Sequence, residues 1–118
     1  MIVELALPWP DATLSPNSHL HWRARQVAKV LARDVALVLA RQTGAHLDTA
    51  EDLELILILH PPDRRHRDAD NILSSLKESI DSVCKAVGVD DSQIKRLVLE
   101  WGNVAKGGKI ELRLEVLV

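Results

Sequence analysis

Residues 53–60 read LELILILH, the most hydrophobic run in the chain, and they decide how the rest of it must fold. The run is too short for a typical helix, and its leucines and isoleucines indicate a buried strand over residues 52–60. Two prolines follow directly and end the strand, since proline cannot donate a hydrogen bond to a neighbouring strand. Such a strand requires a sheet around it and helices to cover it.

Two helices are predicted, one before and one after this strand. Residues 19–42 carry apolar side chains at helical spacing and end at Gly44, and residues 72–87 show the clearest amphipathic pattern and end at Gly88. The apolar positions are Val27, Val30, Leu31, Val35 and Val38 in the first helix, and Ile72, Leu73, Leu76, Ile80, Val83, Cys84 and Val87 in the second.

Three further strands complete the pattern. Residues 2–8 alternate weakly and stop at PWP, whereas residues 93–101 and 109–118 alternate clearly and are joined by GNVAKGG. We expect the last two strands to form an antiparallel hairpin with a long glycine-bearing loop. The order β-α-β-α-β-β predicts an α+β fold, with a mixed sheet packed against two helices in a single domain over residues 1–118.

The composition is that of an ordinary soluble globular protein, with 47% hydrophobic and 27% charged residues among 118. No apolar run approaches the ~20 residues that span a membrane, and the N-terminus lacks the basic region and cleavage site of a signal peptide. The single cysteine, Cys84, excludes an intramolecular disulfide and a cysteine-based zinc site, and we expect it in the core. We therefore expect a cytoplasmic protein with no membrane partner.

The charges are unevenly distributed along the chain. A net charge of −2 and a pI of about 6.2 argue against a strongly basic nucleic-acid binder. Basic residues nevertheless cluster on one face of the first predicted helix and in residues 61–71, PPDRRHRDADN. Either cluster could contact a DNA backbone, and a solvated surface is the alternative. The helix cluster consists of Arg25, Lys29, Arg33 and Arg41, and the second cluster consists of Arg64, Arg65 and Arg67.

Asp68 and Asp70 stand one residue apart where the second helix begins. In an extended segment, positions i and i+2 point the same way, so both carboxylates could face one ion. A helix N-terminus also tolerates negative charge without a metal. A helix cap with one additional acid is therefore the alternative interpretation.

Further polar residues favour a catalytic site over a cap. The segment VDDSQI places Asp90 and Asp91 between the second helix and the next strand. Carboxylates combined with a lysine and arginines suit phosphoryl chemistry, because Mg²⁺ prefers hard oxygen ligands and arginines grip flanking phosphates. The second helix also carries a polar stripe at spacings of four, three and four, formed by Asp70, Ser74, Lys77 and Asp81.

Taken together, these motifs resemble those of the RusA family of phage- and prophage-associated Holliday junction resolvases. LPWP, PPDRRHRDADN, the pair Lys77…Asp81, VDDSQI and AKGG occur in the family's order over essentially the whole chain. The most specific part is R-x-D-x-D-N followed, beyond the helix, by D-D-x-Q. The resemblance implies a homodimeric endodeoxyribonuclease that acts on four-way junctions or other branched DNA. It also implies a Mg²⁺ cofactor, for which Mn²⁺ would substitute.

The resemblance further assigns roles to residues. Lys77 is the expected functional lysine, although the family pattern places it three residues after the asparagine, where this chain has Ser74. The expected catalytic acids are Asp68, Asp70 and Asp91, and the expected metal ligands are these three and Asp90. The clustered charges, rather than the resemblance, give the expected DNA contacts: Arg25, Lys29, Arg33, Arg64, Arg65, Arg67 and, in the glycine-bearing loop, Lys106 and Lys109. For the two lysines an ordinary hairpin loop is the alternative.

Other patterns lead to further hypotheses. His19 and His21 form an H-x-H pair, but no third zinc ligand is evident in the sequence. The three tryptophans are the only aromatic residues, so we expect them to pack in the core, with base stacking as the alternative. D-x-D also occurs in haloacid dehalogenase phosphatases, where it follows a strand immediately, whereas residues 60–67 intervene here. A catalytically inactive DNA- or protein-binding module with the same fold is the alternative function.

Overall fold

A computed structural model describes residues 2–18 and 22–118. The strands are β1 (Ile2–Pro8), β2 (Leu53–His60), β3 (Ile94–Trp101) and β4 (Lys109–Val116). They form a four-stranded sheet in the order β1-β4-β2-β3, so the predicted buried strand is an inner strand. β4 is antiparallel to both β1 and β2, and β2 is parallel to β3, which makes the sheet mixed, as predicted.

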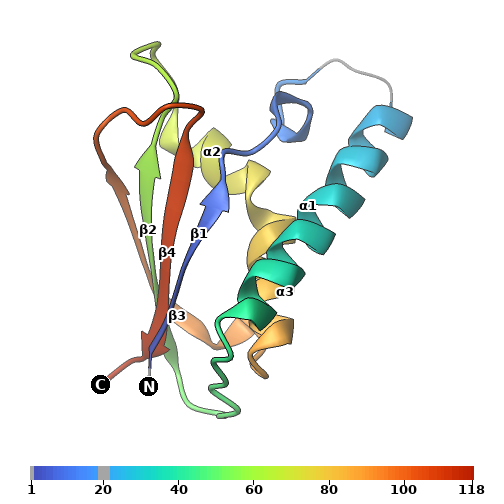
Figure 1. Cartoon of the computed structure of the whole chain (residues 1–118). Coiled ribbons are helices and arrows are strands. Elements are labelled where there is room, and N and C mark those ends of the chain that lie inside the picture. Colours follow the sequence, from blue (N-terminus) through green and yellow to red (C-terminus); the bar gives the residue numbers. More distant parts are fainter. Residues whose placement is uncertain (1, 19–21) are drawn as a thin grey trace.

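The helices lie on one face of this sheet (Figure 1). They are α1 (Trp22–Gln42), α2 (Ala69–Ser75) and α3 (Lys77–Ala86), with short 3₁₀ turns η1 (Ala12–Leu14) and η2 (Asp91–Gln93). α1 packs against α3 and also contacts β1, and side chains of α3 join those of the sheet in the core. The predicted α+β fold is confirmed. His19 and His21, which the sequence suggested as zinc ligands, lie outside the described residues.

The predicted hairpin between the last two strands is wrong. β3 pairs with β2, and β4 lies on the opposite side of β2. The helices α2 and α3 return the chain to the end of the sheet where β2 began, so β3 starts there and runs parallel to β2. The loop 102–108 then crosses the end of β2, where the Gly102 N–H donates to the carbonyl oxygen of Leu59.

The second predicted helix is divided into α2 and α3 at Leu76. This residue has φ −93° and ψ −3°, the sparsely populated bridge between helical and extended backbone, and its side chain is fully buried. The sequence has no helix-breaking residue at this point, and helical hydrogen bonds continue on both sides: the Leu76 N–H donates to the carbonyl oxygen of Ile72, and the Ile80 N–H donates to that of Leu76.

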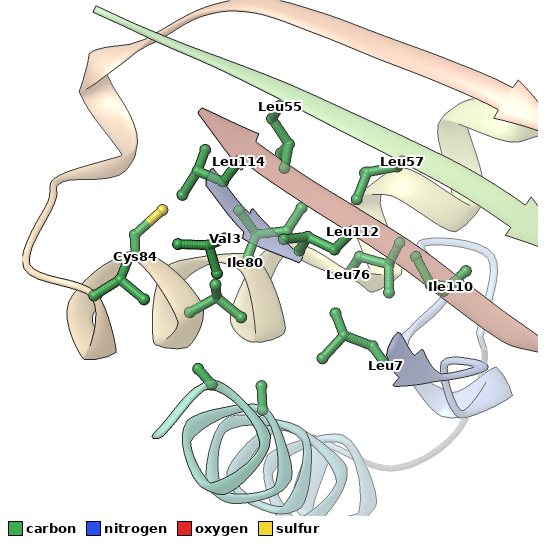
Figure 2. Close-up of a cluster of buried hydrophobic side chains, with 14 of the residues drawn as sticks. Val3, Leu7, Leu55, Leu57, Leu76, Ile80, Cys84, Ile110, Leu112 and Leu114 are labelled. Carbon is green, nitrogen blue, oxygen red and sulfur yellow. The ribbon is translucent and has the colours of Figure 1, made fainter. Parts of the chain in front are cut away.

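The core lies between the sheet and α3 (Figure 2). Side chains of β2 and β4 that point to the helical face alternate with side chains on the outer face, as strand geometry requires. Burial raises the pKa of the Cys84 thiol to about 12, so this cysteine is a protonated core residue, as predicted. The other core residues labelled in Figure 2 include Leu55 and Leu57 of β2, Ile80 of α3, and Ile110, Leu112 and Leu114 of β4.

α1 is a helix, as predicted, but most of its apolar side chains do not enter the core. Its buried residues are two alanines, Ala36 and Ala40, whereas Val27 is 68% and Leu31 62% exposed. The spacing of apolar residues indicated a helix correctly, yet that apolar face points away from the sheet. We refer to four exposed residues as the α1 stripe: Val27, Val30, Leu31 and Val38.

The tryptophans were expected in the core, and this prediction is only partly confirmed. Trp9 packs against the core, whereas Trp22 and Trp101 are exposed. Leucine, isoleucine and valine fill the core instead. In the parts of the chain that the structure describes, no helix is both long and apolar enough to cross a membrane.

Candidate active site

The turn that enters β3 is stabilised by the side chains of two residues in its D-D-S-Q sequence, Asp90 and Gln93. The Asp90 carboxylate accepts hydrogen bonds from the hydroxyl and the backbone N–H of Ser92, which lowers the pKa of Asp90. The Gln93 side chain accepts from the Asp90 N–H at 2.7 Å and donates to the carbonyl oxygens of Thr49 and Glu51, both at 2.8 Å. The capping box closes the turn, and the two bonds from the Gln93 amide hold it against the segment that enters β2.

Asp91 faces α3 rather than this network. Its carboxyl group lies near that of Asp81, and both residues line the same hollow. Burial raises the pKa of Asp81, the negative charge of Asp91 raises it further, and the nearby ammonium of Lys77 opposes the rise. Two acids from separate elements therefore meet at one point, with a lysine close by.

The acidic pair borders an open hollow of about 370 Å³ beside β3. Three members of the predicted polar stripe line this hollow together with Asp91: Ser74, Lys77 and Asp81. Asp70, the fourth member, lies one helical turn before Ser74 on the same side of α2. The fold thus brings the polar stripe beside the D-D-x-Q turn, which the sequence alone could not establish.

The turn that enters α2 is fastened by Asp63. Its carboxylate accepts from the Arg65 N–H at 2.9 Å and pairs with the Arg67 guanidinium at 2.9 Å, and these contacts hold the pKa of Asp63 well below its usual range. Arg67 also donates to the carbonyl oxygens of Asp63 and Arg65 and lies 5.6 Å from the ring centroid of Trp9. Only 15% of the Arg67 side chain is exposed, so this arginine organises the turn.

Asp68 is the N-cap residue of α2, yet its side chain makes no capping hydrogen bond. The expectation that Asp68 and Asp70 extend side by side is wrong, because Asp70 lies within the first turn of α2 and only Asp68 is extended. Residues two apart on a helix point about 200° apart. Asp68 lies 3.5 Å from His66 and lines a second hollow of about 510 Å³ with Trp9 and Arg67.

Three segments that are distant in sequence form one corner beside this second hollow. Gly108 has φ +74°, and a Cβ there would lie 2.8 Å from Trp9 and 3.1 Å from Pro62. A side chain at this position would clash and would strain the backbone, so glycine is required. The LPWP, PPDRRHR and AKGG motifs therefore meet in space.

The other basic residues that were predicted to contact DNA lie on several surfaces. Arg33 of α1 pairs with Glu78 of α3 at 2.7 Å, which lowers the pKa of Glu78 and ties the two helices together. Lys109 lies 3.5 Å from Glu111 on the outer face of the sheet. The remaining positions are exposed or half-exposed: Arg25, Lys29, Arg64, Arg65 and Lys106.

The Asp81–Asp91 pair offers carboxylate oxygens, the ligands that Mg²⁺ prefers. Within residues 2–18 and 22–118, no three His, Cys, Asp or Glu side chains are grouped to hold one metal ion. Mg²⁺ is commonly held by one or two carboxylates, with waters and substrate phosphate completing its shell, so the pair fits this ion. The predicted ligand set stays a prediction: Asp68, Asp70, Asp90 and Asp91.

Asp81 is the site residue that the sequence reasoning did not assign. The sequence placed Asp81 on the polar stripe, four residues after Lys77, but gave it no role. Its contact with Asp91 depends on how η2 returns beside α3, and this return is fixed by the hydrogen bonds of Gln93. The sequence signal for Asp81 was therefore its position on the polar stripe. The sequence could not show that Asp91 lies beside it in the fold.

Known proteins resemble this chain over most of its length. An uncharacterized protein of Xylella fastidiosa (strain Temecula1 / ATCC 700964) is 34% identical over 113 residues, which cover 93% of this chain and 74% of the relative. The crossover junction endodeoxyribonucleases RusA of Enterobacteria phage 82 and of Escherichia coli (strain K12) are each 30% identical over 112 residues, covering 93% of this chain and 91% of theirs. No family model matches the chain.

Proposed function

Because the chain belongs to the RusA family of crossover junction endodeoxyribonucleases, we propose that it resolves Holliday junctions and related branched DNA in recombination and repair. The proposed reaction is Mg²⁺-dependent hydrolysis of phosphodiester bonds, with symmetric nicks in two strands. The observation that carries the proposal is the meeting of the Asp81–Asp91 pair and Lys77 at one open hollow. This combination of carboxylates and an ammonium group suits phosphoryl transfer better than a structural ion pair.

A divalent ion, when bound, would supply Lewis-acid activation of the phosphate and of a water molecule, and Mn²⁺ would serve in place of Mg²⁺. Asp68, Asp70 and Asp91 are the carboxylates that we propose to hold the ion, with Asp90 beside them. Lys77, exposed at the start of α3, would neutralise charge on the scissile phosphate within the hollow.

The DNA backbone would be held by basic side chains outside the hollow. Arg64, Arg65 and Lys106 are exposed on the loops that end β2 and precede β4. Arginine suits this role because its planar guanidinium can make two parallel hydrogen bonds to a phosphate. Arg25 and Lys29 of α1 would extend the contact, whereas Arg33 and Arg67 would act mainly by positioning the elements to which they are bound.

We further propose that the protein acts as a homodimer. A four-way junction has approximate two-fold symmetry and is cut in two strands, so a C2 dimer with two equivalent sites suits the task. The α1 stripe supports this assembly, because apolar residues at helical spacing remain exposed on the face of α1 that points away from the core. A second copy of α1 would cover this face.

Cleavage of a synthetic four-way junction tests the proposed activity. We expect the wild-type protein to nick the junction symmetrically in Mg²⁺ or Mn²⁺, to spare a linear duplex, and to lose cleavage in EDTA. Asp70→Asn should retain junction binding and lose cleavage, whereas Asp52→Asn, an exposed acid before β2, should leave both unchanged. Wild-type protein that bound the junction without cutting it would instead support the inactive binding module. The specific feature that favours that alternative is Ser74, which stands where the family pattern has its lysine.

Light scattering after gel filtration tests the dimer. We expect a dimer for the wild type and a monomer for Leu31→Asp, because a charge on the α1 stripe would have to be buried at the interface. Val104→Asp, an exposed valine on the loop before β4, is the matched control and should remain dimeric. A wild-type monomer that still nicked junctions symmetrically would contradict the assembly.

A further inference from the structure

The last residue of β2, His60, anchors the loop that precedes β4. Its side chain is only 15% exposed, and its Nδ1 atom lies 2.9 Å from the carbonyl oxygen of Asn103 in loop 102–108. A carbonyl oxygen only accepts hydrogen bonds, so Nδ1 carries a proton and is the donor. This bond fixes the orientation of the imidazole ring toward the loop.

The other ring nitrogen of His60, Nε2, adds no hydrogen bond to this anchoring. It is buried and lies 3.4 Å from the Glu111 carboxylate, yet it has no hydrogen-bond partner among the described residues. The same Glu111 oxygen lies 3.5 Å from the ammonium group of Lys109. A buried polar atom without a partner lowers stability, so an apolar residue would fill this position better if filling were its whole role. The Nδ1 bond to the loop is the contact that an apolar residue could not make.

The loop lies directly on the imidazole ring. A Cβ atom at Gly102 would be 2.4 Å from Cε1 and 2.6 Å from Nδ1 of His60, so a side chain there would collide with the ring. Backbone hydrogen bonds flank the His60 contact. The Gly102 N–H donates to the carbonyl oxygen of Leu59 at 2.9 Å, and the Ala105 N–H donates to that of Pro61 at 3.0 Å. Consecutive residues at the end of β2 thus hold the first half of the loop, and His60 alone among these three does so with its side chain.

The tip of the same loop presents an exposed lysine, Lys106. The Gly108 N–H donates to the carbonyl oxygen of Ala105 at 2.8 Å, which closes a turn around the lysine. Gly107, at the third position of this turn, has φ +75°, a conformation that glycine adopts without strain. The backbone of the tip is therefore set by contacts with the end of β2, and the His60 bond is one of them.

We propose that His60 is a positioning residue for DNA binding: its Nδ1–H fixes loop 102–108 so that Lys106 contacts a DNA phosphate. The loop that carries Arg64 and Arg65 leaves the same end of the sheet, so these exposed basic side chains belong to one surface (Figure 1). A loop that is ordered before binding loses less conformational freedom on binding, which raises affinity. The inference rests on the proposed function and deepens it, because it assigns a residue that orients one of the proposed DNA contacts.

Hydrogen exchange followed by NMR without DNA tests the anchoring. His60→Leu removes the donor, whereas His60→Asn places an amide N–H close to the position of Nδ1. His60→Gln is the matched control, because its amide reaches the position of Nε2 instead. We expect the Ala105 amide to exchange faster in the Leu and Gln variants and at the wild-type rate in the Asn variant, while amides of β2 and β4 keep their rates. An unchanged rate at Ala105 in His60→Leu would overturn the anchoring.

Binding of a synthetic four-way junction in EDTA tests the role in DNA recognition. We expect His60→Leu, Lys106→Ala and the double variant to bind equally weakly, roughly 2–10-fold weaker than the wild type, because all three lose the same phosphate contact. Each should also reduce the slope of log affinity against log salt concentration by about 0.9 for every subunit in contact with the DNA. His60→Asn and the control Lys85→Ala, which removes an exposed lysine of α3, should match the wild type.

Two binding results would overturn the inference. Losses of affinity that add up in the double variant would show that His60 acts independently of Lys106. An affinity of His60→Asn as low as that of His60→Leu would show that the Nδ1 donor is not the group that matters. A purely structural role predicts a lower unfolding temperature with an unchanged salt slope, and this outcome would also contradict the proposal.

Gly102→Ala provides a second route to the same test if His60→Leu does not fold. Its added Cβ forces the loop away from the ring and leaves the histidine in place. We expect its affinity to fall as in Lys106→Ala, with no further loss when the two changes are combined, and an unchanged affinity would overturn the inference. The inference and the proposed function fail separately. Wild-type protein that binds junctions without cutting them would contradict only the function, whereas wild-type affinity in His60→Leu would contradict only the role of His60.

Discussion

The two turns that carry the acidic motifs, residues 61–68 before α2 and residues 89–93 before β3, begin in the same way. In each, an aspartate carboxylate accepts the N–H of the residue two positions later: Asp63 from Arg65 at 2.9 Å, and Asp90 from Ser92 at 3.0 Å. Such a local hydrogen bond is what favours aspartate in turns. In both turns the first acid thus shapes the backbone, and later acids are left for the site.

The turns differ in what fastens them to the rest of the protein. The first is held by a charged group, Arg67, which binds Asp63 and lies over Trp9. The second is held by a neutral amide, Gln93, which binds two carbonyl oxygens in the segment before β2. The comparison shows that the residues of a dense run of charges can pair mainly with one another, whereas the neutral glutamine of an acidic motif can fix the position of the acid beside it.

The largest expected effect is on junction cleavage, and it should differ between variants of the two adjacent acids of the second turn, Asp90 and Asp91. Asp91→Asn should reduce junction cleavage by on the order of 100-fold or more, because it removes a carboxylate that we propose to hold the metal ion, and even supporting groups of metal sites cost about 10–100-fold. Asp90→Asn should retain most cleavage and should lower the unfolding temperature, because Asp90 caps η2. Kinetics with a synthetic junction and thermal unfolding of both variants check this. Equal losses of cleavage would show that the two acids do not divide their roles as the structure indicates.

A smaller effect is expected when the amide that fastens the second turn is removed. Gln93→Ala loses three hydrogen bonds, and at a net contribution of about 0.5–1.5 kcal/mol each we expect the free energy of unfolding to fall by about 1.5–4.5 kcal/mol. Urea denaturation with an unchanged m value would measure this loss. Cation affinity should also fall, because Asp91 would no longer be held against Asp81. Full stability in the variant would mean that η2 is anchored by other contacts.

The smallest expected effect is a pH-dependent change in unfolding temperature when the ion pair between Asp63 and Arg67 in the first turn is removed. Asp63 has a folded-state pKa below its unfolded value, so it contributes stability above the unfolded pKa, and this contribution is lost as the pH falls through the folded pKa. Asp63→Asn should therefore unfold at a lower temperature than the wild type at neutral pH. The difference should narrow as the pH falls below about 4. It should also shrink in high salt, whereas the effect of Gln93→Ala should not. A difference that stayed constant with pH would exclude the ion pair as its cause.

The elements of the fold were predictable where a pattern is local. The run LELILILH indicated β2, and the periodicity of residues 72–87 indicated a helix whose apolar side chains, such as Ile80 and Cys84, enter the core. The same kind of periodicity in α1 indicated the helix but not its orientation, because an apolar face can meet a core or remain exposed. The hairpin prediction was wrong for a related reason: alternation identifies a strand, and its partner is chosen by the rest of the sheet.

For the candidate site, the sequence by itself determined the chemical groups: two acidic turns, a helix carrying a polar stripe, and a lysine on that stripe. These follow from residue types and from the fixed spacing of a helix, which are properties of the chain. Only the tertiary structure decided which groups meet. It brought Asp91 to Asp81, placed Asp68 at a different hollow, and bound Arg67 and Arg33 to acids of the protein itself. The physical reason is that contacts between distant segments depend on how η2, α3 and β3 pack together, and no local pattern in the sequence encodes that packing.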